Sequence, residues 1–237
     1  MYGTDYAEIS DLMYRGRGRD YRAEAEEVAR RARSLLPDAR SLLDVGCGTG
    51  AHLEEFADLF EDVAGLELSQ DMLAVARVKD LPCVWYHGDM RAFDLGRRFD
   101  VVTCMTGAIG HVESAAELTR TLQCFARHLS PGGVVAVDPW WFPETFSDGY
   151  VAGDVVTVGE RTVARVSHGR REGDCSRTEV HHVIATPGDG VRHFSEVHLG
   201  RLFSRAEYEA AFAGAGLAVE YIEGLHSGRG LFVACRG

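Results

Sequence analysis

The sequence predicts an α/β protein in which a parallel sheet carries an antiparallel, β-rich insertion between its fifth strand and its last helix. Residues 41–138 alternate short apolar runs, typical of buried strands, with helical patterns. A glycine-rich turn at 46–50 joins the first of these strands to the helix that follows. Residues 150–203 contain strand-like runs separated by turn sequences, with no helical pattern between them.

Each element follows from the spacing of apolar residues. The first long helix is predicted over 21–36, where apolar residues recur at helical spacing until Pro37 ends the run. The strands of the parallel sheet are predicted at 41–46, 63–68, 83–90, 99–105 and 134–138, and the helices between them at 52–60, 71–78 and 116–129. After the insertion, Ser204 and Glu207 form a capping box for a helix over 204–216, and strands at 217–223 and 230–236 follow.

The charge balance excludes some classes of partner. The 237 residues include 25 Lys and Arg against 36 Asp and Glu, a formal charge of −11, which disfavours nucleic acid as a partner. No apolar run approaches the roughly 18–20 residues of a membrane span, and the first residues lack the pattern of a signal peptide. We therefore expect a soluble, cytoplasmic protein with reduced cysteines and no membrane partner.

Metal binding is not indicated by the cysteines or the histidines. The six cysteines contain no C-x-x-C pair, so a zinc site is unsupported. Histidines gather in the insertion at His181, His182, His193 and His198. Because successive side chains on a strand point to opposite faces, His181 and His182 cannot ligate together, and we expect no metal site.

The glycine-rich turn predicts a binding site for a nucleoside. Its spacing, Gly46, Gly48 and Gly50 after Asp44, fits neither the G-x-G-x-x-G loop of nicotinamide-binding proteins nor a P-loop. Glu67 ends the second strand, where a carboxylate can accept both hydroxyls of a ribose. Asp89 and Met90 end the third strand, where an acid and a flat apolar side chain suit an adenine. Each residue alone could be a turn, a surface acid or a helix cap, but the three in register favour a nucleoside cofactor.

At these residues the chain resembles the class I S-adenosylmethionine-dependent methyltransferases. The runs LDVGCGTG, GLEL and GDM carry the resemblance, which spans residues 40–140. It implies a Rossmann-like seven-stranded sheet whose last strand is antiparallel, with S-adenosylmethionine as the cofactor. It also implies which residues bind that cofactor: Tyr14, Arg19, Asp44, Gly46, Gly48, Glu67, Leu68, Asp89, Met90 and Met105.

A narrower resemblance covers nearly the whole chain. Residues 16–21, 139–144, 165–168 and 227–232 are similar to the dTDP-3-amino-sugar N,N-dimethyltransferases, and the run WWFPE is the most specific of these signals. The chain departs from that family at Gly46, Asp138 and Ser10, where alanine, glutamate and tyrosine are common. The resemblance implies N,N-dimethylation of a dTDP-linked amino-deoxysugar of the 3-amino-3,6-dideoxyhexose type in antibiotic biosynthesis. The position of the amine, C3 or C4, stays open.

This reading divides the chain into three parts. Residues 1–38 form an N-terminal lid and helix, residues 39–140 and 204–237 form the cofactor-binding domain, and residues 141–203 form a β-rich insertion for substrate binding and dimerisation. The strands of the insertion would pair across a two-fold axis, so we expect a homodimer.

Two side chains are candidates for catalysis. His111 follows the fourth strand, where this fold opens its substrate pocket, and it could accept a proton from the amine directly or through water. Its alternative role is to cap or pack the next helix. Tyr2 lies with Tyr14 on the N-terminal lid, and its alternative is a merely packed or frayed terminus.

The diphosphate of the substrate requires hydrogen-bond donors. The candidates are Arg17, Arg170, Arg171 and Arg229, with the hydroxyls of Ser167 and Ser227. Lys79 is the single lysine, so arginine is the ordinary cation of this chain and one arginine alone is weak evidence. Trp140, Trp141 and Phe142 would stack on thymine or wall the sugar site, or they would belong to the core. These arginines would make the pocket basic within an acidic protein.

Two other functions compete with this one. The chain could methylate a small amine such as glycine or sarcosine, which needs no diphosphate site. It could also bind S-adenosylmethionine without catalysis, as an assembly protein.

Overall fold

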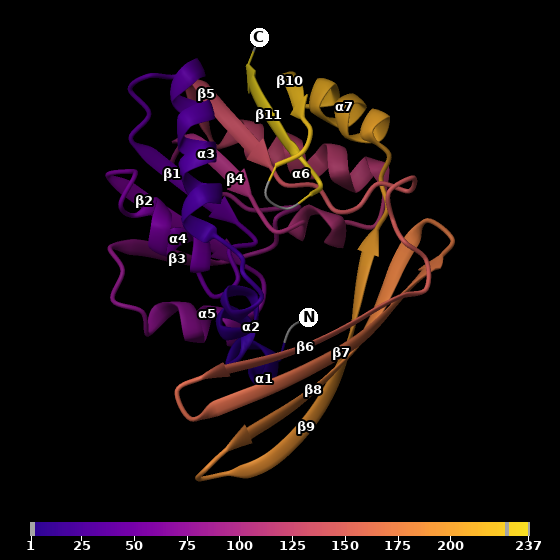
Figure 1. The fold of residues 1–237 in the computed structure, drawn as a ribbon. Coiled ribbons are helices and arrows are strands. Elements are labelled where there is room, and N and C mark those ends of the chain that lie inside the picture. The colour runs from indigo at the N-terminus through magenta and orange to yellow at the C-terminus, as the bar shows by residue number, and fades with distance from the viewer. Residues whose placement is uncertain (1–2, 226–227, 237) are drawn as a thin grey trace.

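The computed structural model describes residues 3–225 and 228–236 and places their strands in two sheets (Figure 1). The first sheet has seven strands in the order β10-β11-β5-β4-β1-β2-β3, and the second has four in the order β6-β7-β8-β9. The strands of the first sheet are β1 (Ser41–Val45), β2 (Asp62–Glu67), β3 (Cys83–His87), β4 (Phe99–Cys104), β5 (Leu129–Val137), β10 (Leu217–Ile222) and β11 (Leu231–Arg236). Those of the second sheet are β6 (Tyr150–Val158), β7 (Arg161–Glu172), β8 (Cys175–Thr186) and β9 (Gly190–Arg201).

The topology confirms the predicted fold class. Strands β1 to β5 pair in parallel, and β11 inserts antiparallel between β5 and β10. The four strands of the insertion pair antiparallel in chain order. One boundary differs: β5 begins at Leu129, the last residue of the predicted helix, and not at residue 134, so residues 129–133 lie within the strand, where the β4–β5 register shifts.

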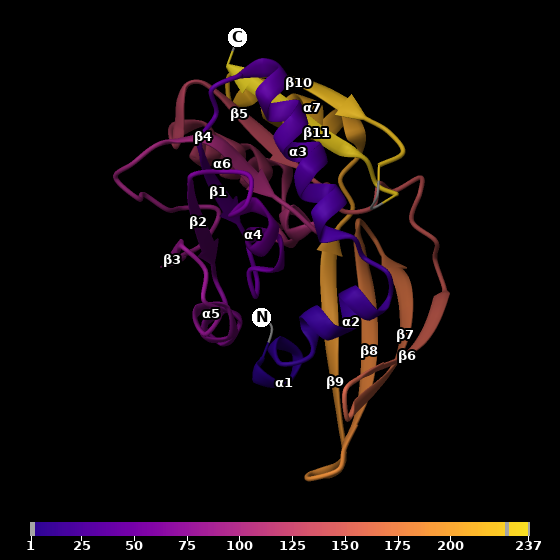
Figure 2. The same ribbon diagram turned by 60° about the vertical axis from the view of Figure 1, so that its left-hand side comes forward.

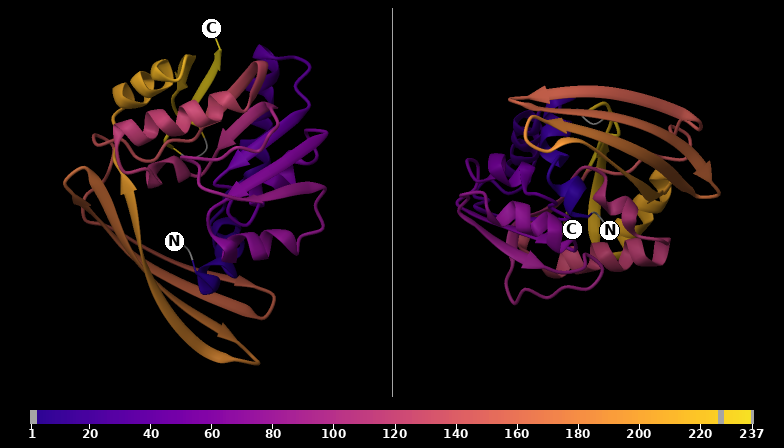
Figure 3. Two further views of the ribbon diagram at one scale, coloured as in Figure 1. Left: turned by 180° about the vertical axis from the view of Figure 1, so that it is seen from behind. Right: turned by 90° about the horizontal axis from the view of Figure 1, so that it is seen from below.

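Helices cover both faces of the first sheet. They are α1 (Thr4–Ala7), α2 (Ser10–Gly16), α3 (Tyr21–Leu35), α4 (Ala51–Phe56), α5 (Gln70–Arg77), α6 (Ala115–Arg127) and α7 (Arg205–Gly214), with a short 3₁₀ helix η1 (Ala108–His111). Figure 3 shows α6 and α7 lying together on one face, and α3 packs with α4 against the other. Side-chain caps start several of them, including the predicted capping box of Ser204 and Glu207 on α7.

The central strand β1 shows how alternation builds two cores. Leu42 packs in the cluster that includes α3 and α4, whereas Leu43 packs in the cluster that includes α6 and α7. Both side chains are fully buried. Because successive side chains of a strand point to opposite faces, an uninterrupted apolar run is what a sheet covered on both faces requires.

The second sheet is joined to the first by the N-terminal helices. In Figures 1 and 2, α1 and α2 lie between α5 and strands β6 to β9. Ile9 and Met13 pack with Val156, Val163 and Ile184 of the second sheet. Helix α1 also contacts α5 beside the first sheet. No described helix is both long and apolar enough to cross a membrane.

Candidate active site

A cavity of about 630 Å³ lies between the two sheets. One wall comes from the carboxyl ends of β1, β2 and β4, which is where ligands bind in open α/β sheets. The facing wall comes from residues 196–200 of β9, and α1 and α2 contribute residues from the N-terminal segment. Its volume is in the range of pockets that enclose a cofactor or a drug-sized ligand.

Gly46 and Gly48 of the glycine turn line this cavity. Gly46, Gly48 and Gly50 all have positive φ, at 72°, 57° and 79°, which glycine adopts without strain. A Cβ on Gly46 would lie 2.9 Å from the Cβ of Ala108. The turn therefore brings bare backbone to the cavity wall, which fits close approach of a cofactor.

Glu67 presents a rigid carboxylate to the cavity. The backbone N–H of Gly48 donates to its Oε2 at 2.9 Å, and that of Ser69 donates to its Oε1 at 2.8 Å. Only 9% of Glu67 is exposed, and it lines the cavity. Because each carboxylate oxygen has a second lone pair, both can still accept a hydrogen bond from a ribose hydroxyl.

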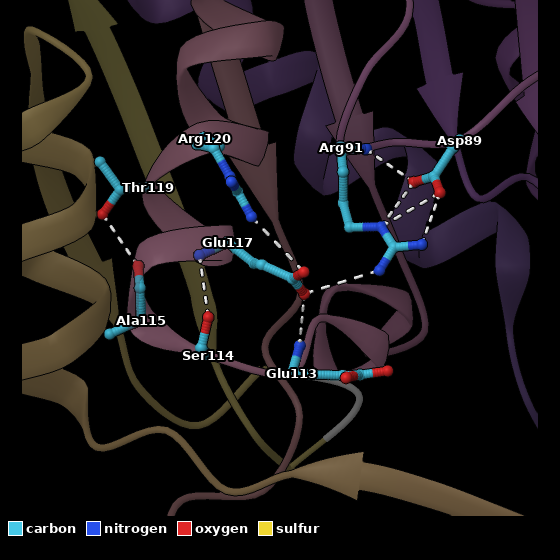
Figure 4. Close-up of polar contacts among 8 residues, drawn as sticks. All are labelled: Asp89, Arg91, Glu113, Ser114, Ala115, Glu117, Thr119 and Arg120. Carbon is cyan, nitrogen blue, oxygen red and sulfur yellow. Dashed lines mark hydrogen bonds and ion pairs between the residues drawn. The ribbon is translucent and has the colours of Figure 1, made fainter.

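Asp89 is held by an arginine that the sequence pattern does not single out. Arg91 donates to both carboxylate oxygens of Asp89, with its Nη2 2.6 Å from Oδ2 (Figure 4). Arg91 Nη1 lies 3.6 Å from Oε2 of Glu117, and the same oxygen accepts from the backbone N–H of Glu113 at 2.9 Å. The Arg91 hydrogen bonds lower the pKa of Asp89, so the end of β3 keeps an oriented anion and is tied to the start of α6. Asp89, Met90 and Arg91 all line the cavity.

Asp44 lies behind the glycine turn rather than on the cavity wall. It is 1% exposed, and Thr103 Oγ1 donates to its Oδ1 at 2.8 Å. Burial raises the pKa of Asp44 to about 6, so the group is largely ionised at neutral pH but at a free-energy cost. Its effect on a cofactor in the cavity would be electrostatic, not a direct contact.

The N-terminal segment closes the cavity from one side. Tyr6, Ser10, Asp11 and Tyr14 line it. Asp11 pairs with Lys79 Nζ at 2.5 Å and accepts from Thr49, so α2 is fastened to the glycine turn and to the end of α5. The predicted catalytic Tyr2 lies outside the described residues, as does Ser227.

Arg19 supports this segment from outside the cavity. Its guanidinium lies 2.7 Å from Glu24 and over the ring of Tyr14, 5.5 Å from the ring centroid. Glu24 also pairs with His52 at 2.8 Å. Burial would raise the pKa of Glu24, but hydrogen bonds from His52 and Arg19 outweigh it and hold the pKa at about 2. Arg19 therefore orients Tyr14 and the start of α3 and does not itself line the cavity.

His111 lines the cavity at the end of η1, as the sequence predicts. It hydrogen-bonds to the backbone of Leu199 on β9. Burial among protein atoms, and then the positive charge that the neighbouring His198 can carry, lower the pKa of His111. The imidazole is therefore neutral at pH 7, and one ring nitrogen retains a lone pair.

Trp140 forms the end wall of the cavity. Its Nε1 donates to Ser176 Oγ at 2.8 Å. A Cβ on Gly107, Gly110 or Gly200 would lie 2.7, 2.7 or 2.6 Å from Trp140, so three glycines leave the space that the indole fills. Gly107 follows Thr106, whose φ of 60° is unusual for a β-branched residue and marks strain at the cavity wall.

The two aromatic residues after Trp140 have a different role. Phe142 is 6% exposed and packs against Tyr208, Tyr221 and Phe232 in the core, so it does not wall the sugar site. The guanidinium of Arg229 lies 5.6 Å from the ring centroid of Trp141. Trp141 is not among the residues that line the cavity.

The structure does not bring the predicted diphosphate donors to the cavity. Arg17 pairs with Asp154 at 3.1 Å, Arg229 with Asp138 at 2.8 Å, and the exposed Arg170 with Glu172 at 2.8 Å. The guanidinium of Arg171 donates to the backbone carbonyls of Gly173 and Pro143, its backbone N–H donates to Asp148, and Ser167 is buried away from the cavity. In a chain with more carboxylates than cations, nearby acids pair with Arg17, Arg170 and Arg229.

The expected basic pocket is therefore absent from the described part of the chain. The cavity is lined by one arginine, Arg91, against five acids, which are Asp11, Glu67, Asp89, Glu113 and Glu196. Glu196 and His198 are additions to the predicted site. The sequence could have indicated them only if the strand pairing that turns one face of β9 toward the cavity had been known.

The fold and the cavity together define a class I methyltransferase. Residues 42–133 match the family model of a methyltransferase domain. The chain is 59% identical to the dTDP-3-amino-3,4,6-trideoxy-α-D-glucopyranose N,N-dimethyltransferase of Streptomyces venezuelae, over 98% of both chains. It is 52% identical to the dTDP-3-amino-3,6-dideoxy-α-D-glucopyranose N,N-dimethyltransferase of Streptomyces fradiae, over 100% of this chain and 92% of that one.

Solved structures agree with these relatives. The crystal structure of Streptomyces venezuelae DesVI superposes with a TM-score of 0.94 at 57% identity, over 100% of both chains. An S-adenosylmethionine-bound amino pentose methyltransferase of Micromonospora echinaspora gives 0.89 at 49% identity, over 100% of this chain and 98% of that one. The chain belongs to the family of S-adenosylmethionine-dependent sugar N,N-dimethyltransferases.

Proposed function

We propose that this enzyme transfers two methyl groups, one after the other, from S-adenosylmethionine to the amino group of a dTDP-linked 3-amino-3,6-dideoxyhexose in antibiotic deoxysugar biosynthesis. One observation carries the proposal. A single cavity joins a nucleoside-binding wall, with Glu67 and Asp89, to a second wall with His111 and Trp140. The relatives at 59% and 52% identity are named for 3-amino sugars, and a relative at 47% is named for a 4-amino sugar, which supports C3.

The cavity residues suit a cationic cofactor. When bound, S-adenosylmethionine supplies a methyl group on a sulfonium, which an amine attacks in line. Gly46 and Gly48 would approach its methionyl part, Glu67 its ribose, and Leu68, Asp89 and Met90 its adenine, with Met105 and Tyr14 toward the reacting end. The carboxylates on this wall would stabilise the positive charge of the sulfonium. The acidic lining of the cavity therefore suits the cofactor.

Alignment is the main task that remains for the protein. A free amine is a good nucleophile, so the site must hold its lone pair in line and exclude water. The neutral imidazole of His111 would accept a hydrogen bond from the amine, while Trp140 would wall the sugar. In this account Arg17, Arg170 and Arg229 keep their internal partners, and residues 141–203 act as the substrate and dimerisation unit.

A homodimer through the second sheet is part of the proposal. The face of that sheet turned away from the cavity carries exposed apolar side chains, among them Val155 at 71%, Val166 at 57% and Val183 at 40%. Exposed apolar patches of this kind mark association surfaces. A second copy of the chain, placed by a two-fold axis, would cover the patch with the same patch.

A substrate panel tests the proposed activity against its alternatives. The enzyme is incubated with S-adenosylmethionine and dTDP-3-amino, dTDP-4-amino, glycine and sarcosine substrates, and added methyl groups are counted by mass spectrometry. We expect methylation of the dTDP-3-amino sugar, and measurable binding of dTDP by calorimetry. Methylation of glycine or sarcosine without dTDP binding would favour a small-amine enzyme, and tight cofactor binding without any methylation would favour a non-catalytic protein.

A further inference from the structure

A row of charged and imidazole side chains crosses the inner face of the second sheet. In the strand register, Arg165 of β7 stands opposite Asp154 of β6 on one side and His182 of β8 on the other. Its Nη1 lies 3.6 Å from Oδ2 of Asp154. Glu196 Oε1 lies 3.5 Å from Nε2 of His182 and 2.9 Å from Nε2 of His198. Of this row, Glu196 and His198 line the cavity.

Glu196 is a stable anion within this row. Burial would raise the pKa of Glu196, but the nearby imidazoles of His182 and His198 outweigh that effect and bring the pKa to about 2. A carboxylate in contact with an imidazole orients the ring and stabilises its protonated form. The two histidines compete for this role.

Their surroundings distinguish the two histidines. The side chain of His182 is 1% exposed, stands opposite Arg165 in the strand register and is not among the residues that line the cavity. The side chain of His198 is 20% exposed and meets the cavity. Among the described residues, Tyr6 of α1, whose ring centroid lies 5.5 Å from that of His198, and His111 of η1 also face His198. His198 is thus the ring that can exchange a proton with the cavity.

We propose that His198, supported by Glu196, accepts the proton that the substrate's amino group must lose before each methyl transfer. The inference rests on the proposed function. The sugar ammonium gives a proton to neutral His198, which becomes an imidazolium, and the amine lone pair then forms the N–C bond as the S–C bond breaks. The imidazolium releases its proton to water before the methylated ammonium is deprotonated for the second transfer.

An imidazole between carboxylate and substrate solves a conflict of charge. If Glu196 contacted the ammonium directly, it would stabilise the charged form, which has no lone pair to attack with. His198 takes a proton from the ammonium, and the positive charge then lies on the imidazolium next to Glu196. Glu196 is therefore a positioning residue, and His111 stays neutral because its neighbour holds the proton.

The pH dependence of methyl transfer tests this role. Single-turnover rates are measured between pH 6.5 and 9.5, with enzyme preloaded with S-adenosylmethionine, for wild type, His198→Asn, Glu196→Gln and the control Glu160→Gln, which changes an exposed carboxylate in the β6–β7 hairpin. We expect His198→Asn to be slowed by roughly tenfold to a hundredfold at pH 7. The deficit should shrink as the pH rises, because more of the amine arrives unprotonated. Glu196→Gln should show a smaller deficit of the same form, and Glu160→Gln none.

Two results would overturn the inference: a His198→Asn deficit that is equal at every pH, or rates equal to wild type throughout. Cofactor binding by calorimetry is measured on each variant to exclude misfolding. A second readout does not depend on activity. In the free enzyme, the NMR signals of the His198 ring should change between wild type and Glu196→Gln, because the variant loses the carboxylate that orients the ring. Unchanged ring signals contradict the inference, whereas absence of methylation by wild type contradicts the proposed function alone.

Discussion

At the scale of single residues, the site is acidic where the cofactor would lie. Glu67 and Asp89 are held by backbone N–H groups and by Arg91, so their orientation does not depend on a ligand. Asp44 adds a third carboxylate behind the glycine turn. These carboxylates are complementary to a cationic cofactor. None of the arginines predicted to bind the anionic diphosphate lines the cavity.

The replacement Asp44→Asn should stabilise the cofactor-free protein and weaken cofactor binding. The folded pKa of about 6 lies above the reference value of 3.8. The stabilising contribution of the protonated form is therefore complete below the unfolded pKa and is lost as pH rises through 6. At pH 7 the ionised form costs about 3 kcal/mol, which asparagine removes.

Urea unfolding checks the expected gain in the free energy of unfolding, which should shrink between pH 7 and pH 4. Calorimetry should show roughly tenfold weaker S-adenosylmethionine binding, about 1.4 kcal/mol, because a negative charge is lost. The exposed Asp94 supplies the control Asp94→Asn. No gain in stability at pH 7 would contradict the account of Asp44.

The replacement His111→Asn should slow turnover by a modest factor, roughly tenfold, because alignment carries most of the catalysis. Asparagine keeps a polar contact near Leu199 but has no imidazole lone pair. Steady-state kinetics with the dTDP-amino sugar measure kcat and KM, and cofactor affinity should be unchanged. A loss of several thousandfold would instead make His111 an essential base.

At the scale of elements, the end of the cavity depends on how closely β9 approaches Trp140. A Cβ on Gly200 would lie 2.6 Å from Trp140 Nε1, in the place of the hydrogen bond to Ser176. We expect Gly200→Ala to displace the indole, raise KM for the sugar nucleotide by roughly tenfold and leave cofactor binding intact. The matched control is Gly153→Ala on β6, where the nearest atom would be 3.8 Å away. Equal KM values for the two variants would show that Trp140 does not shape the sugar site.

The long elements were predictable because their apolar periods are set locally. Every predicted strand and helix is present. A continuous apolar run such as 41–46 is typical of a strand in a sheet that is covered on both faces, so it could be recognised from the sequence. The short helices α1, α2 and η1 were not predicted, because their few residues carry little periodicity, whereas the equally short α4 falls within the longer helical pattern at 52–60.

Contacts between segments that lie far apart in the chain could not be predicted from the sequence. Gly46, Glu67 and Asp89 were predictable because each follows its own strand. Glu196 and His198 reach the cavity only through the pairing of β9. Arg17 and Arg229 form ion pairs with Asp154 and Asp138, which lie far from them in the chain, and so do not line the cavity. No local pattern records these encounters.

At the scale of the whole molecule, the second sheet separates a cavity-facing side from an exposed apolar side. A charge on the exposed side should prevent association. We expect Val155→Glu, alone or with Val166→Glu, to convert a dimer to a monomer in light scattering after size exclusion. The control Val78→Glu alters a residue that is 83% exposed on the α/β domain and should leave the mass unchanged. A monomeric wild type, or dimeric Val155→Glu and double variants, would contradict this interface.

The central claim is that two methyl groups reach the amine of a dTDP-linked 3-amino sugar. The most direct measurement is the mass of dTDP-3-amino-3,6-dideoxyglucose during incubation with the enzyme and excess S-adenosylmethionine. The account predicts a transient product with one added methyl group and a final product with two, both on nitrogen. An unchanged mass, or a product that stops at one methyl group, would contradict it.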